Sequence, residues 1–566
     1  RVVAPVAARV RLLALALASI AVVGIVVAPS PRITGPAFTA PIQHAHQVAD
    51  SMVRSRGVDP TTWRRLTAAA RDTQLDFRAF LRRHDAESLA TQLAGSYAIP
   101  AWWIVRYVRP EASLAERVEE WRARVLPDGR PLDLRHVIGE SEPRDAITAA
   151  SARQIALAAV ESTGVQGALL EIDLVETPRP GRRDFTLTFA DTAVALPDAA
   201  TARLTVSLAG PEVLSVRRGI QLPQAFLRQA RGEFANAMTV AGFVTLPALA
   251  LLIWGMVRSR RLPVAATDDL PRRALVAFLI VLAVSSIASS LLDLPSDQAL
   301  YDTAVPWRTF LASVTGTQVM SLVGAFVFAA LWLLANGMRR RAGIPLVAGA
   351  PTGRAMSDDL LAGLALGGIP GATGAIGRII PSGAMSSVPH TTLDSAVPLL
   401  TRVVEVLPDA VGTMLAISLP ALALYTFSHR PAIRWSVSVL FLLLAGTAVL
   451  SFRSSAGTDA GFARLAWTLV AAAVFIVGLL YWGRVSVLSW LLGAVFASAI
   501  SNLSFALHAP TGVERGSGLL AMLLAVAILA AGNLFARRQQ PRPAWSRAGP
   551  NEDRLSLEHP PSNAPA

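Results

Sequence analysis

The sequence predicts an α-helical polytopic membrane protein of about ten spans that carries one α+β domain outside the membrane. Of its 566 residues, 53% are hydrophobic and only 16% are charged, whereas a soluble globular protein carries roughly 25% charged residues. Apolar stretches long enough to cross the hydrocarbon, about 20 residues each, recur along the chain. One mostly polar segment of about 205 residues separates the first stretch from the others.

The apolar stretches divide the chain into four parts. We predict a signal anchor in 1–29, an extracytoplasmic domain in 30–235, a multi-span helical domain in 236–540 and a disordered cytoplasmic tail in 541–566. The first stretch could be a cleaved signal peptide, but its length favours an uncleaved anchor. Because residue 1 is arginine, we expect the start of the chain to be missing. The predicted spans are 10–28, 236–257, 274–292, 309–336, 359–380, 408–427, 435–452, 463–482, 485–506 and 518–536.

Arginine determines the predicted orientation. The chain has no lysine, so all 52 basic residues are arginine. They are concentrated in alternate loops, such as 258–273 and 339–341, and basic loops of bacterial membrane proteins face the cytoplasm. We therefore predict a cytoplasmic (inner) membrane protein with both ends inside and residues 30–235 outside. The same distribution accounts for the net charge of +13, so we expect no nucleic-acid partner.

Residues 30–235 show an alternation of helix and hairpin patterns. Apolar residues at helical spacing predict helices, and short alternating runs around Gly- or Pro-containing turns predict hairpins. Helix followed by hairpin, twice, predicts two similar α+β modules. The predicted helices are 42–56, one that begins after Asp76 as N-cap, and 149–163; the predicted strands are 102–108, 121–125, 132–134, 169–176, 183–190, 202–208 and 213–220.

The layout of this domain resembles that of a known group of proteins. The strand 121–125, with the turn Pro127-Asp128-Gly129-Arg130, is similar to phrases in bacterial membrane proteins that place a PepSY-like extracytoplasmic region before a multi-span domain. Members of the CPBP group of intramembrane proteases, relatives of the CAAX prenyl proteases, are among them. The resemblance covers about the first 240 residues. It implies that this region is a binding or inhibitory module.

The catalytic pattern of the CPBP group occurs here in an unsuitable place. That group is similar in using Glu-Glu-x-x-x-Arg and two histidines on spanning helices. Glu119-Glu120 and Arg124 match the pattern, but they lie on a predicted strand outside the membrane. Neighbouring side chains of a strand point to opposite faces, so we expect the two carboxylates to diverge.

Three polar residues remain as candidates for a divergent catalytic site: Glu405, Asp409 and His508. Glu405 could simply pair with Arg402, three residues away on a helix. For His508 we favour an interhelical hydrogen bond, although an ionisable group in a membrane is a candidate functional residue by default. We predict no cofactor and no metal site, and zinc only if the protein is a protease. There is no cysteine to bind a metal or act as nucleophile.

The predicted span 359–380 contains glycine at every fourth position, at Gly363, Gly367 and Gly371, and Pro370 lies just before the third of them. Small residues at this spacing let helices approach closely, and proline removes a backbone donor. We predict a tightly packed, bent helix in preference to a substrate path. The glycines are not a phosphate-binding loop, because that motif requires lysine.

Three hypotheses follow for the function. The first is a non-catalytic relative of the CPBP proteases, whose partners are the lipid bilayer and, as a candidate, an extracytoplasmic protein or peptide. The second is an active intramembrane metalloprotease with a divergent site. The third is a transporter of a small solute, because discontinuous helices often line transport sites.

Overall fold

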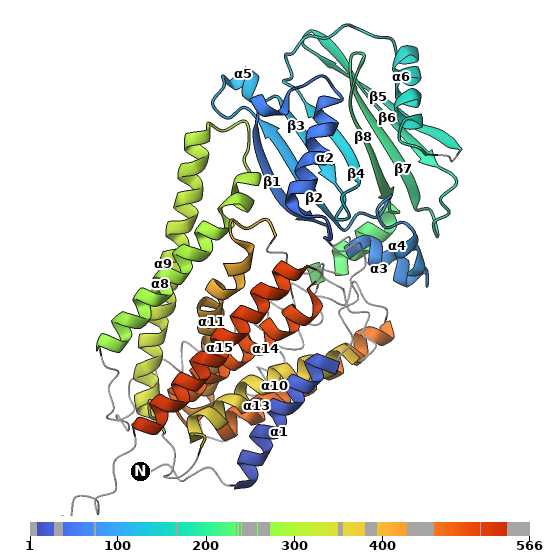
Figure 1. Cartoon of the computed structure of the whole chain (residues 1–566). Helices are drawn as coiled ribbons and strands as arrows, with labels where there is room; N and C mark the ends of the chain where they lie inside the picture. Colours follow the sequence, from blue (N-terminus) through green and yellow to red (C-terminus); the bar gives the residue numbers. More distant parts are fainter. Residues whose placement is uncertain are drawn as a thin grey trace, which may run out of the picture.

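The computed structural model describes two parts, a domain of two β-sheets and a bundle of long helices (Figure 1). The described residues are 8–27, 38–72, 75–165, 168–233, 272–348, 355–379, 393–426, 458–509 and 511–539, with isolated residues between 233 and 272. The domain comprises residues 38–233 and lies at one end of the bundle (Figure 1). The predicted tail 541–566 lies outside the described residues.

The first module of the domain is a four-stranded antiparallel sheet, called sheet 1 here, with helix α2 (Ile42–Arg54) on one face. Ala45, Ala49 and Val53 of α2 are fully buried, because a spacing of four places them on one side of the helix. Short helices connect the strands: α3 (Leu75–Arg83), α4 (Ser88–Gln92) and α5 (Leu114–Arg117). The strands lie side by side in chain order: β1 (Arg64–Arg71), β2 (Ala101–Val108), β3 (Glu120–Val125) and β4 (Pro131–Val137).

The second module repeats this plan. Helix α6 (Ala149–Glu161) covers one face of a second antiparallel sheet, sheet 2, and buries Ala152, Ala156 and Val160 against it. Phe185, Leu187 and Phe189 of the sheet alternate toward the same core, as the two-residue period of a strand requires. The strands again follow chain order: β5 (Leu169–Arg179), β6 (Arg182–Asp191), β7 (Thr201–Ala209) and β8 (Glu212–Gln221).

Most of these elements match the predicted ones, with two corrections. Strand β1 is absent from the prediction, because its sequence from Arg64 to Arg71 is mainly arginine and alanine, which are not typical of strands. Asp76 is not an N-cap: α3 begins at Leu75 and Asp76 lies in its first turn, where a carboxylate is still favoured by the helix dipole. Each module has a helix and four strands.

Four helices among the described residues are long and apolar enough to cross a membrane. Two shorter apolar helices, 11–27 and 466–482, fall below that length. The described residues thus hold four candidate spans, where the sequence predicts about ten. The predicted span 435–452 and almost all of 236–257 lie outside the described residues. The bundle helices are α1 (Ala8–Val27), α8 (Arg272–Ala299), α9 (Trp307–Ala342), α10 (Asp358–Ile379), α11 (Pro398–Thr426), α13 (Thr458–Trp482), α14 (Val487–His508) and α15 (Gly512–Arg538).

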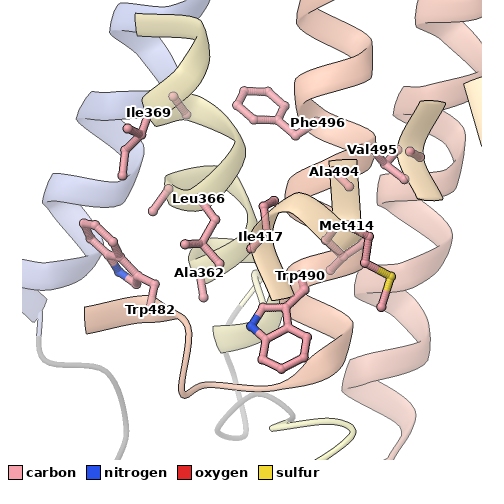
Figure 2. Packing of buried hydrophobic residues seen from close by; sticks show 14 of the residues in the cluster. Ala362, Leu366, Ile369, Met414, Ile417, Trp482, Trp490, Ala494, Val495 and Phe496 are labelled. Carbon is pink, nitrogen blue, oxygen red and sulfur yellow. The ribbon is translucent and has the colours of Figure 1, made fainter. Parts of the chain in front are cut away.

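The core of the bundle surrounds α10 (Figure 2). Leu366 and Ile369 of α10 lie among buried side chains of α11, α13 and α14, including Trp482 and Trp490 (Figure 2). On another side α10 packs against α1, whose Ala14, Ala18, Ala21 and Ile25 are buried. The first turns of these two helices are joined by an ion pair of 3.0 Å between Arg11 and Asp358.

The glycines of α10 are the contact points of this packing. A Cβ at Gly363 would lie 2.8 Å from the Leu492 Cβ of α14, and one at Gly371 would lie 3.0 Å from the Ala21 Cβ of α1. A Cβ at Gly367 would overlap the backbone of Gly493. The prediction of a tightly packed glycine helix is therefore confirmed. Helix α10 continues through Pro370.

The β7–β8 turn supplies a test of the second module. Gly210 has φ +54°, and a Cβ there would lie 2.5 Å from the backbone oxygen of Asp145. We expect Gly210→Ala to lower the free energy of unfolding by about 2 to 3 kcal/mol, since backbone strain and a backbone clash add. Gly164→Ala is the matched control, because Gly164 has φ +73° but open space around it. Urea unfolding should show a smaller loss for the control, and equal losses would contradict the packing at Gly210.

Candidate functional site

The three candidate catalytic residues lie on two helices. Glu405 and Asp409 are on α11, and His508 is the last residue of α14. Glu405 is 3.4 Å from the Arg402 guanidinium, which also lies 4.3 Å from the centre of the Phe505 ring on α14. Glu405 therefore forms the ion pair that its spacing predicts, and this pair is part of the packing between two helices.

Among the described residues, His508 makes an intrahelical hydrogen bond instead of the expected interhelical one. Its Nδ1 lies 2.7 Å from the carbonyl oxygen of Ser504, one turn back on the same helix. Asn502 also donates within α14, to the carbonyl oxygen of Ser498 at 3.0 Å. In apolar surroundings the backbone of the previous turn is the nearest available partner for a polar side chain. His508 therefore bonds back to the preceding turn of its own helix.

The described residues include no group of three histidine, aspartate or glutamate side chains placed to hold a metal ion. Glu405, Asp409 and His508 are not brought together as one ligand set. His390 and His429, the other histidines of 236–540, lie outside the described residues. Within the described part, no arrangement supports activation of a water by a metal or by a paired general base.

The Glu119-Glu120 pair diverges, as the strand pattern predicts. The Glu120 carboxylate is fully buried and pairs with Arg106 and Arg122. The Glu119 carboxylate instead contacts His136, at 3.1 Å, and Arg109, at 3.5 Å. Both carboxylates are thus held in structural ion pairs, and they belong to two different clusters of side chains.

The first cluster joins the domain to the helices and is the main candidate functional site. Arg106, on β2, is buried, and its Nε donates to Glu120 at 3.2 Å. Its Nη1 donates to the carbonyl oxygens of Ala299, at 2.9 Å, and Tyr301, at 2.6 Å. These carbonyls lie at the last residue of α8 and in the turn that leads to α9. One guanidinium therefore links a carboxylate of sheet 1 to the backbone of the bundle, and we call this contact the latch.

Further contacts surround the latch. Arg117 donates from Nε to the carbonyl oxygen of Thr303 at 2.8 Å. The Arg64 guanidinium lies 4.2 Å from the centre of the Trp307 ring, a favourable cation–π distance. An apolar cluster of Leu66, Val108, Tyr301 and Trp307 fills the space between sheet 1 and the start of α9. Water is thereby excluded, which strengthens the ion pair at the latch.

The outer edge of sheet 1 is also attached to the bundle. The backbone N–H of Ala69, on edge strand β1, donates to the Asp394 carboxylate at 3.1 Å. Two residues further on, Ala396 donates from its backbone N–H to the carbonyl oxygen of Leu292 on α8 at 2.8 Å. The short segment before α11 therefore bridges β1 and α8. Helix α8 and the segment that leads into α11 thus both contact sheet 1.

The second cluster joins the two modules to each other. The His136 ring, on β4, lies parallel to the Trp121 ring with 3.8 Å between their centres. Its Nδ1 is 2.5 Å from Glu212 of β8, and its Nε2 is 3.1 Å from Glu119. Glu212 also accepts a hydrogen bond of 3.1 Å from Arg144. Edge strands β4 and β8 are thereby connected through one imidazole, and we call this contact the clasp.

The clasp has opposed effects on its titratable groups. Burial works against the charged imidazolium, but the hydrogen bonds of Glu119 and Glu212 outweigh it and raise the pKa of His136 above its ordinary value. The hydrogen bond from His136 is the main cause that lowers the pKa of Glu119 and of Glu212, against burial. All three shifts favour the charged cluster, so the clasp is an imidazolium between two carboxylates.

The clasp predicts how stability depends on pH. The contribution of His136 is complete below its ordinary pKa of 6.5 and is lost as pH rises through the raised value in the folded protein. The contribution of the two glutamates is complete above 4.5 and is lost as pH falls. We therefore expect maximum stability of the contact between the modules at mildly acidic pH. His136→Gln should flatten this maximum and cost about 1.5 to 3 kcal/mol.

Thermal unfolding of the full chain across pH checks this expectation. His44→Gln is the matched control, because His44 is exposed on α2. A profile that His136→Gln leaves unchanged, or that His44→Gln changes equally, would contradict the assigned role of the clasp.

No family model, curated protein or solved structure matches the chain. The latch, the clasp and the surfaces of the two modules are the features that bear on function. Arg106 is absent from the residues predicted to be functional, although the sequence carries a signal for it. Arg106 is the single charged residue in the aromatic and β-branched run from Trp102 to Val108, and a charge in a buried strand requires a partner.

Proposed function

We propose that this protein is a non-catalytic membrane protein of the cytoplasmic membrane whose two-module domain binds a partner outside and passes that event to helices α8 and α9. In this proposal it spans the membrane about ten times and is a relative of the CPBP proteases that lacks their catalytic residues. The observation that most supports this proposal is the latch. Arg106 donates both to Glu120 of sheet 1 and to the α8–α9 turn. A rigid-body movement of sheet 1 would move this turn with it.

The arrangement of charges supports the proposed orientation. The end of the bundle away from the domain gathers loops that we expect to be cytoplasmic. There Asp358 pairs with Arg11, and Asp359 accepts from the backbone N–H of Ala348 at 2.9 Å. Asn533 of α15 accepts from the backbone N–H of Ser357 at 2.8 Å. At the opposite end, the Ala299–Tyr301 turn contacts the domain.

Chemical labelling tests this orientation. The chain has no cysteine, so a single introduced thiol has no background. We expect a membrane-impermeant maleimide to label Arg56→Cys, at the exposed end of α2, in intact cells. It should label Arg538→Cys, at the exposed end of α15, only after lysis. The opposite pattern would invert the proposed topology.

Proteolysis assays test the absence of catalysis. Purified protein in detergent should cleave no member of a peptide library faster than its His508→Ala and Glu405→Gln variants do. Cleavage that disappears in those variants would contradict the proposal and favour the intramembrane protease, for which zinc would be the expected metal. The transporter alternative would need the glycine-containing helix α10 to line a solute site. The glycines of α10 instead pack against α1 and α14, so this alternative gains no specific support.

A further inference from the structure

The two sheets have four edges, and three of them are covered in the part of the chain that the structure describes. The β1 edge is bound by Asp394 and lies against α8. The β4 and β8 edges lie against each other at the clasp. The fourth edge is β5, whose one paired strand is β6. An uncovered edge presents backbone N–H and C=O groups that can pair with another strand.

Strand β5 is unusually long and exposed for an edge strand. It contains 11 residues, against a usual length of about five or six. Its apolar side chains Leu170, Ile172 and Val175 are 61%, 42% and 47% exposed. Proteins normally shorten or cover such an edge because it promotes association. The register shifts between Glu171 and Asp173, and Pro178 lacks a backbone donor. The regular stretch from Asp173 to Thr177 therefore has the properties of a binding strand.

The charges of β5 indicate what kind of strand it would accept. Glu171, Asp173 and Glu176 are all exposed. Glu171 and Glu176 pair with Arg153 and Arg183, whereas Asp173 makes no ion pair within the described residues. Opposite charges on neighbouring strands stabilise a sheet, and like charges opposite each other destabilise it. Glu171 and Glu176 lie opposite Phe189 and Phe185, which face the core, whereas Asp173 lies opposite Thr188 on the other face of the sheet. An incoming strand that alternates apolar and basic side chains can place its basic side chains on the face of Asp173, the carboxylate without an ion pair among the described residues.

We propose that the free edge of β5 binds an extended, basic and apolar segment of a different polypeptide by adding it to sheet 2 as a fifth strand. This proposal rests on the proposed function and specifies its partner class. A second copy of the chain fits less well, because pairing two β5 strands would bring the three carboxylates of each strand into one ladder. Main-chain hydrogen bonds would supply affinity and the side chains specificity, as in other cases of strand addition.

The test uses the full chain in nanodiscs of zwitterionic lipid and a fluorescein-labelled peptide of alternating valine and arginine, about nine residues long. We expect saturable binding by fluorescence anisotropy. A valine–glutamate peptide and a valine–arginine peptide that is N-methylated along its backbone should not bind. These two probes separate the contribution of charge from that of the backbone ladder.

Variants assign the site. Asp173→Lys replaces an attractive cross-strand pair by a repulsive one, so we expect binding weaker on the order of tenfold. Glu111→Lys makes the same charge change at an exposed position of the first module and should leave binding unchanged. Three results would overturn the proposal. They are equal effects of the two variants, binding of the N-methylated peptide, and no binding of the valine–arginine peptide. So would a dimer of the chain that Asp173→Lys disrupts.

These outcomes are independent of the latch. Peptide binding measures the β5 edge alone, whereas transmission to α8 and α9 is measured by distances within the chain without any peptide. Failure of strand addition with an intact latch would leave the proposed function standing with a different partner.

Discussion

Arg106→Ala should lower the free energy of unfolding of the domain by about 3 kcal/mol. The substitution leaves the fully buried Glu120 carboxylate with Arg122 as its remaining ion-pair partner. Removing one member of a buried ion pair costs about 3 to 5 kcal/mol, because the other charge stays buried. The lower end applies here, since Arg122 remains. Urea unfolding of the full chain in detergent, followed by tryptophan fluorescence, measures the loss.

Two variants control for this effect. Arg106→Met combined with Glu120→Leu removes both charges at once and should recover most of the stability, because apolar pairs often replace buried ion pairs without loss. Arg183→Ala breaks the exposed pair with Glu176 and should change stability by less than about 1 kcal/mol. If the double variant is as unstable as Arg106→Ala, then the buried charge of Glu120 is not the cause of the lost stability.

Gly367→Ala should destabilise the bundle more than alanine at any other described glycine of α10 does. The new Cβ would overlap the backbone of Gly493 on α14, and backbone atoms cannot rotate away as a side chain can. Overpacking of this kind typically costs about 1 to 3 kcal/mol. The thermal stability of the purified full chain should fall accordingly, and its fraction that elutes as a single species should decrease.

Gly374→Ala is the matched control in the same helix. Gly374 is exposed and a Cβ there meets no atom within 4 Å. Alanine also favours helix more than glycine does, so stability should be unchanged or slightly higher. Similar losses for Gly367→Ala and Gly374→Ala would show that propensity rather than interhelical contact explains the glycines.

Local patterns predicted the domain well, because its elements carry their own signals. The turn at Gly210 and the apolar alternation of β6 and β7 are readable within a few residues. Strand β1 was not predicted, because its composition is not typical of a strand. It forms a strand because it pairs with β2. Tertiary context commonly overrides strand propensity in this way.

The candidate site could be predicted only in part. The divergence of Glu119 and Glu120 follows from the two-residue period of a strand. The spacing of Arg402 and Glu405 predicted their ion pair. The latch was not predictable, because Arg106 and the Ala299–Tyr301 segment are nearly two hundred residues apart. Every residue has a backbone carbonyl, so the sequence does not indicate which carbonyls accept a hydrogen bond. For His508, hydropathy alone could not distinguish the intrahelical partner Ser504 from an interhelical one.

The most direct test of the latch is a distance between two spin labels on the full chain. With no cysteine in the sequence, labels can be placed at Arg56→Cys on the first module and at Leu300→Cys in the α8–α9 turn, both exposed positions. We expect one narrow distance distribution in the otherwise unchanged chain and a broad one when Arg106→Met and Glu120→Leu are added. A broad distribution in both, or an identical narrow one, would contradict a domain held to its helices by Arg106.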